Sequence, residues 1–194
     1  MTDSLNLPAH IQSKLDGLKA EENELKLLTD NFEKESMPFW YLHLIQNNAV
    51  IGAVFTMDKE TDLSGLGVNM TWMKPSDTVE ESQEFYPGIA VTKMGYVPVG
   101  ICRSGSGDPY FLKMSPSYQK ATLVRIPHDL VEEDDSYLEE NIEYVSHSLV
   151  EFFDLCSIVE KRKTPKDSHN DRLEYKQSKI QLGNQLKDYL ADND

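Results

Sequence analysis

Two short apolar runs separated by a glycine-rich turn form the clearest pattern in the chain. Residues 96–102 and 110–114 are mostly apolar, and residues 104–109 between them contain two glycines, an aspartate and a proline. This arrangement predicts a β-hairpin, in which glycine accepts positive φ and Pro109 stands at the entry of a strand. Because both runs are apolar at consecutive positions, we expect both faces of their sheet to be covered.

A helical stripe runs through residues 6–35. Asn6 or Leu7 is the expected cap, because Pro8 is tolerated in a first turn. The stripe has no apolar member at Glu22, which indicates a break into two helices near residues 17–22. Its apolar members recur at helical intervals, at Ile11, Leu15, Leu18, Leu25, Leu28 and Phe32.

Residues 37–55 permit two interpretations. Pro38 followed by apolar residues at 41, 44 and 45 suits a short helix that ends at Asn47 and Asn48. Aromatic and β-branched residues on both sides of an Asn-Asn turn suit a hairpin equally well. Under either interpretation we expect a strand over residues 49–55.

Outside the hairpin, the pattern over residues 68–135 predicts short elements. Alternating apolar residues predict a strand over 68–73, and Asp77 or Thr78 is the expected cap of a short helix that ends at Glu84. A turn follows at 86–88. A strand is expected at 123–126, before an acidic loop at 132–135.

A long helix is predicted over residues 136–159. Ser136 and Glu139 have the spacing of a capping box, in which each side chain bonds the backbone N–H of the other residue. Apolar residues then recur at intervals of three and four, at Leu138, Ile142, Val145, Leu149, Phe152, Cys156 and Val159. This helix is expected to bury one face on the sheet, with Cys156 as a buried thiol.

These elements predict an α+β fold, a single mostly antiparallel sheet covered by helices. We expect three parts: an N-terminal helical segment over residues 1–36 packed on the domain, an α+β core over 37–160, and a C-terminal extension over 161–194. The extension has weak helical periodicity and is interpreted as an extra amphipathic helix.

Composition agrees with a globular domain, with 39% hydrophobic and 27% charged residues. The sequence shows no apolar run of membrane-spanning length and no signal peptide at its N-terminus, so a cytoplasmic location is expected. Cys102 and Cys156 are far apart and are interpreted as reduced, buried thiols.

The chain is strongly acidic, with 33 acidic against 19 basic residues and a formal net charge of −14. Such a surface repels phosphate, which argues against nucleic acid or an anionic membrane as a partner. It favours a basic partner, and it also keeps a protein soluble.

Motifs for metal or nucleotide binding are missing from the sequence. The five histidines form no metal-binding spacing, and the acidic residues at 132–135 lack the alternation of a calcium loop. The glycines at 105 and 107 match neither a P-loop nor a dinucleotide fingerprint, so turn chemistry explains them better. No cofactor and no metal are expected.

Nucleophilic catalysis has one candidate pair. Cys102, beside Arg103, and His128 would form a Cys–His pair if folding brought them together, whereas a cysteine in an apolar strand is more often part of a core. Arg103, Arg125 and Asp108 are candidates for a structural ion pair at the end of the sheet.

Four segments, taken in order, carry a family resemblance. They are F-Y-P-G-I at 85–89, the hairpin at 96–114 with its G-S-G-D turn, L-V-R-I-P-H-D at 123–129 and S-L-V-E-F-F at 148–153. Together they resemble the SUKH superfamily, over about residues 39–159. That group includes fungal cell-wall and killer-toxin-resistance regulators and bacterial immunity proteins. The resemblance implies an α+β domain that binds other proteins and is not an enzyme.

The leading hypothesis is therefore a non-catalytic protein-binding module, most specifically an immunity protein that neutralises a toxin domain. The expected partner is a basic toxin domain. Its candidate contacts are Glu132, Glu133, Asp134 and Asp135, although acidic residues before a helix also suit a solvated loop. The alternatives are a cytosolic regulatory or scaffold protein of the same family, and a hydrolase that uses Cys102 and His128.

Overall fold

The computed structural model describes residues 5–159. Within them the α-helices are α1 (Ala9–Gln12), α2 (Glu22–Asn31), α3 (Phe39–Asn47), α4 (Pro75–Glu84), α5 (Gly88–Val91) and α6 (Leu149–Leu155). The strands are β1 (Val54–Met57), β2 (Val68–Trp72), β3 (Tyr96–Cys102), β4 (Tyr110–Lys113), β5 (Thr122–Arg125), β6 (Glu143–Tyr144) and β7 (Ser157–Ile158). Three 3-10 turns are η1 (Thr92–Met94), η2 (Tyr118–Lys120) and η3 (Glu139–Asn141).

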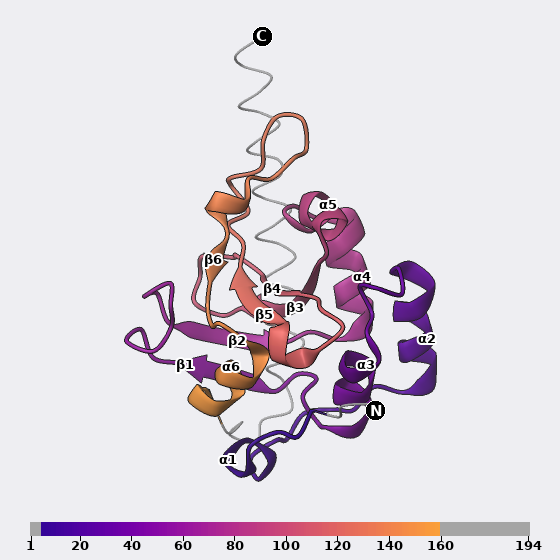
Figure 1. Ribbon diagram of the computed structural model, residues 1–194, viewed down its shortest axis with the longest axis vertical. Coiled ribbons are helices and arrows are strands. Elements are labelled where there is room, and N and C mark those ends of the chain that lie inside the picture. The colour runs from indigo at the N-terminus through magenta and orange to yellow at the C-terminus, as the bar shows by residue number, and fades with distance from the viewer. Residues whose placement is uncertain (1–4, 160–194) are drawn as a thin grey trace. The chain divides into compact units, whose positions relative to one another are not determined.

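The seven strands form one antiparallel sheet in the order β6-β5-β4-β3-β2-β1-β7 (Figure 1). From β1 to β6 each strand pairs with the next strand in the sequence. β7 then returns to pair with β1, with Ile158 opposite Phe55. The predicted α+β fold with an antiparallel sheet and helices is confirmed.

The predicted hairpin is confirmed as β3 and β4, and both of its faces are covered. Successive residues of a strand point to opposite faces. In β4, Tyr110 and Leu112 belong to the main hydrophobic cluster, while Phe111 between them belongs to a second cluster. In β5, Leu123 and Val124 divide in the same way. This explains why apolar residues occur at consecutive positions.

Helix α6 fills the centre of the main cluster with aromatic rings. Phe152 and Phe153 are fully buried, and the ring of Phe153 lies 5.9 Å from that of Phe55 and 6.0 Å from that of Trp72. Cys156 follows the helix and is buried, as predicted. Burial raises the pKa of the Cys156 thiol to about 12.

The long helix predicted over residues 136–159 is wrong at both of its ends. Only Leu149–Leu155 is α-helical, since the preceding residues form η3, β6 and a turn, and Ser157–Ile158 form β7. Ser136 does not cap a helix. The cap is Ser148, whose hydroxyl accepts a hydrogen bond from the Glu151 N–H at 3.1 Å. The S-x-x-E pattern recurs along this stretch, and the occurrence that begins at Ser148 is the one that caps α6.

The N-terminal prediction is right about a break and wrong about its length. Residues 13–21 are not helical and separate α1 from α2. Within this break Gly17 donates its N–H to Ala49 O at 3.1 Å, and Leu18 forms a bridge with Ile51. A Cβ on Gly17 would lie 2.3 Å from Ile51 O, so this close approach requires glycine.

Residues 37–55 follow the helical interpretation, because Phe39–Asn47 forms α3. The strand expected at 49–55 begins only at Val54. The strand expected at 68–73 is confirmed as β2. The helix expected from Asp77 or Thr78 begins earlier, at Pro75, with Lys74 as its N-cap.

The strand expected at 123–126 is confirmed as β5, one residue earlier at each end. The extra C-terminal helix expected over 161–194 lies outside the described residues. Among the described helices, none is long and apolar enough to cross a membrane.

Candidate functional site: an acidic hairpin beside two polar clusters

Residues 129–140, between β5 and β6, form a narrow protruding hairpin, here called the acidic hairpin (Figure 1). Its two arms meet at a bridge between Val131 and Tyr137, and the Glu132 N–H donates to Ser136 O at 3.0 Å. Tyr137 is buried in the second hydrophobic cluster, and its hydroxyl donates to Pro127 O at 3.0 Å. The hairpin is thus anchored to the domain by its inner face.

The tip of the acidic hairpin is ordered by hydrogen bonds. The Asp135 N–H donates to Glu132 O at 3.0 Å, and Asp135 has a positive φ of 63°. The Asp134 carboxylate accepts from the Ser136 N–H at 3.1 Å, and hydrogen bonds from Ser136 lower the pKa of Asp134. The Tyr86 hydroxyl donates to Asp135 Oδ1 and so connects the tip to the α4–α5 turn.

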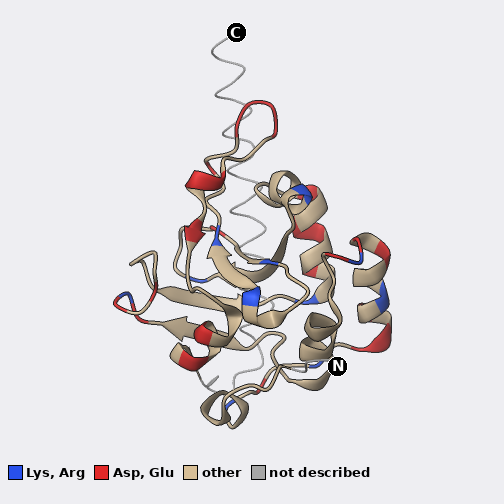
Figure 2. Cartoon of the chain, in the orientation of Figure 1, with Lys and Arg blue, Asp and Glu red and all other residues tan. Residues whose placement is uncertain are grey.

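The four predicted partner-binding residues, Glu132, Glu133, Asp134 and Asp135, all lie at this tip and are all exposed. Seven of the twelve residues of the acidic hairpin are acidic, and residues 126–159 contain no lysine or arginine. Figure 2 shows this protruding loop in red. The structure therefore presents the predicted residues as one dense, preordered patch of negative charge.

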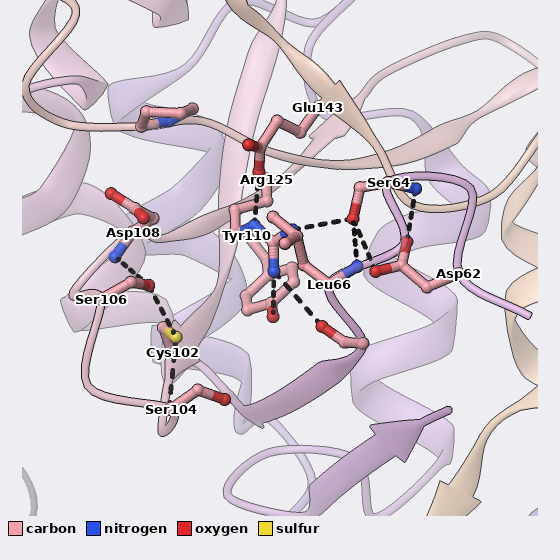
Figure 3. A network of polar contacts seen from close by, with 12 residues as sticks. Asp62, Ser64, Leu66, Cys102, Ser104, Ser106, Asp108, Tyr110, Arg125 and Glu143 are labelled. Atoms are coloured by element: carbon pink, nitrogen blue, oxygen red, sulfur yellow. Dashed lines mark hydrogen bonds and ion pairs between the residues drawn. The ribbon is translucent and has the colours of Figure 1, made fainter. Parts of the chain in front are cut away.

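The structure does not join the candidate pair Cys102 and His128. The Cys102 thiol lies 3.4 Å from Ser106 Oγ and accepts from the Ser104 N–H at 3.4 Å (Figure 3). Among the described hydrogen bonds, none connects this thiol to the imidazole. Ser106 and Asp108 stand between the two groups, since the Asp108 N–H donates to Ser106 Oγ at 3.3 Å.

His128 pairs instead with Asp108. The carboxylate Oδ1 lies 2.7 Å from His128 Nδ1 and accepts from the His128 N–H at 3.1 Å. Burial alone would raise the pKa of Asp108, but the hydrogen bonds from His128 and Ser106 lower it below its usual value. The contact ties the glycine-rich turn to the end of β5. It corrects the expected pairing of Asp108 with an arginine.

Arg125, a predicted member of a structural ion pair, is the centre of a second polar cluster whose other members the sequence did not indicate (Figure 3). It is 5% exposed. Its Nε donates to Glu143 Oε2 at 2.6 Å, its Nη2 to Ser64 Oγ at 2.8 Å and its Nη1 to Gly67 O at 3.2 Å. Ser64 in turn donates to the buried carboxylate of Asp62 at 2.6 Å. About sixty residues separate Ser64 from Arg125, so no sequence motif contains both.

The charges around Arg125 hold it in its ionised form. Burial alone would lower the pKa of Arg125, but the hydrogen bond to Glu143 and the nearby Tyr110 raise it above its usual value. The side-chain atoms of Arg125, Ser64 and Asp62 named above each form a hydrogen bond with another protein group. This cluster therefore joins the β1–β2 connection to β5 and β6, and we interpret it as structural.

Residues 5–159 offer little evidence of a metal site or of a pocket lined by catalytic side chains. No group of three or more His, Cys, Asp or Glu side chains there is placed to hold a metal ion. One open hollow of about 380 Å³ is lined by Leu5, Asn6, Tyr118, Gln119, Ser148 and Val150. This lining provides no carboxylate, imidazole or thiol for acid–base or nucleophilic chemistry.

Comparison with known proteins found no matching family model, no matching curated protein and no matching solved structure. The resemblance to the SUKH superfamily therefore stays a prediction.

Proposed function

We propose that this chain is a non-catalytic protein-binding module that docks a basic partner protein on the acidic hairpin. The observation that carries the proposal is the tip at residues 132–135, where four consecutive acidic residues are exposed on a loop held by backbone and side-chain hydrogen bonds. A preordered surface loses little conformational entropy on binding. A dense patch of one charge accelerates encounter with a partner of opposite charge.

The SUKH-like segments supply the more specific form of the proposal. In that form the partner is a basic toxin domain, such as a nuclease, and the chain neutralises it by direct binding. A nuclease holds its phosphate backbone with lysine and arginine. An acidic hairpin would complement that surface and cover it.

The test is affinity capture from a lysate of the source organism, using the whole chain as bait. A hairpin variant, E132Q/E133Q/D134N/D135N, removes the charge of the tip. A matched control variant neutralises four exposed acidic residues elsewhere, at Glu22, Glu33, Glu35 and Glu60. We expect the hairpin variant to bind the captured partner at least about tenfold more weakly, and the control variant to bind it normally.

A second step separates binding from toxin neutralisation. Each captured protein is co-expressed with the chain, and growth is measured. Rescue of growth by the wild type and not by the hairpin variant would support neutralisation. A partner whose affinity depends on the hairpin but which does not affect growth would leave the binding module standing and exclude the immunity role. Equal affinity of both variants for every partner would contradict the proposal.

A further inference from the structure

The register of the acidic hairpin places two leucines side by side. Val131 pairs with Tyr137, so the neighbouring residues Leu130 and Leu138 stand opposite each other in the two arms. Successive residues of an extended arm point to opposite faces. Tyr137 points inward, into the second hydrophobic cluster. Leu130 and Leu138 therefore share the outward face of the hairpin.

Solvent exposure agrees with this placement. Tyr137 is 5% exposed, whereas Leu130 is 40% and Leu138 is 45% exposed. A single exposed leucine is ordinary on a protein surface. Two leucines opposite each other on an ordered ribbon are different, because directly opposite side chains in paired strands lie within contact distance. The register therefore places the two leucines in one apolar patch, and neither of them belongs to a hydrophobic core cluster.

The surroundings of this patch are acidic. Glu132 and Ser136 lie two residues from the leucines and share their face by the same alternation. Glu139 and Glu140 follow Leu138 directly, and Asp129 precedes Leu130. An apolar centre inside a charged rim is the usual anatomy of a protein-binding surface. In this case the rim carries one sign of charge.

From these observations we propose that the Leu130–Leu138 pair is the apolar centre of the docking surface, and that the partner presents a cationic amphipathic segment. Such a segment places apolar side chains on the leucines and lysine or arginine beside the acidic rim. This inference rests on the proposed function and specifies its partner. Charge complementarity selects the occupant, because a segment with acidic flanks would be repelled.

The test uses a defined probe, a synthetic amphipathic helix of leucine and lysine about 14 residues long, and measures its binding to the whole chain by calorimetry. Two reference peptides are a scrambled sequence of the same composition and one in which serine replaces every leucine. We expect the amphipathic peptide to bind more tightly than both references. L130S/L138S should weaken its binding at least about tenfold. A control variant, L66S/L155S, changes two leucines that are 53% and 45% exposed and should bind normally.

The outcomes separate this inference from the proposed function. If the hairpin charge variant weakens binding and L130S/L138S does not, charge alone makes the docking surface and the inference fails, while the binding module stands. If L130S/L138S and L66S/L155S weaken binding equally, the leucine pair is not a specific centre. Binding to neutral phosphatidylcholine vesicles that depends on Leu130 and Leu138 would overturn the inference in favour of a membrane. Self-association that L130S/L138S abolishes would overturn it in favour of a second copy.

Discussion

At the scale of single residues, Arg125 shows how a charge can be buried at the end of a strand, in β5 beside the edge strand β6. Its guanidinium has a partner on each side, because Glu143 and Ser64 come from β6 and the β1–β2 connection. A buried cation without such partners would carry a large desolvation cost. The arginine therefore serves as a joint between three segments that are far apart in the sequence.

Replacing Arg125 by alanine should lower the free energy of unfolding by about 3 kcal/mol, because it leaves Glu143, Ser64 and Gly67 O without their donor. Chemical denaturation followed by circular dichroism measures this loss. The matched control is K26A, which breaks an exposed pair with Asp30 and should cost less than about 0.5 kcal/mol. Equal losses of unfolding free energy in the two variants would show that the Arg125 cluster does not hold these segments together.

At the scale of elements, the packing of α5 against α4 depends on one glycine. A Cβ on Gly88 would lie 1.9 Å from Glu81 O, within the backbone of α4. The first turn of α5 can approach α4 this closely only because residue 88 has no side chain. The segment between α4 and β3 is thus fixed by a backbone contact.

G88A should consequently destabilise the domain by at least about 2 kcal/mol, since the clash is with main chain that cannot rotate away. G95A is the control. Gly95 has a φ of +82° and open space around its Cβ, so alanine there should cost about 1 kcal/mol from backbone strain alone. Thermal unfolding of both variants measures the difference. A smaller loss in G88A than in G95A would contradict the packing argument.

The elements also show what the sequence could and could not predict. Local patterns were sufficient for the β3–β4 hairpin, for β2 and for β5, because each depends on apolar runs and turn residues. The predicted helix over 136–159 failed because Ile142 and Val145 belong to different hydrophobic clusters on different sides of the sheet. Their spacing resembles a helical stripe, but a helix would place them on one side.

In the candidate site, too, one part was predictable from the sequence and another part was not. The acidic tip was predictable because its residues are consecutive in the sequence. The leucine pair was not, since its meaning depends on the register between Val131 and Tyr137, which only the folded chain shows. Likewise, Asp62, Ser64 and Glu143 around Arg125 become neighbours through the sheet order and not through any motif.

At the scale of the whole molecule, the acidic charge has a cost for stability. Seven acidic residues within the twelve positions of the acidic hairpin repel one another. The hydrogen bonds at the tip and the burial of Tyr137 oppose this repulsion. A concentration of like charge of this kind would trade some stability for the binding surface that the proposed function requires.

E132Q/E133Q should therefore raise the melting temperature by about 1–2 °C at low ionic strength, because it removes two mutually repelling charges. The gain should disappear in about 1 M salt, which screens the repulsion between exposed charges. Scanning calorimetry at both salt concentrations measures this. A lower melting temperature at low salt would mean that these carboxylates stabilise the hairpin.

Because β7 pairs with β1, the sheet becomes complete only late in the synthesis of the described residues. β1 to β5 are neighbours in order, so each can pair with its predecessor as it leaves the ribosome. The outer edge of β1 has no partner until Ser157 and Ile158 emerge, roughly a hundred residues later. A nascent chain of this protein would thus expose an open strand edge while roughly a hundred further residues are made, which leaves that edge open to pairing with another chain.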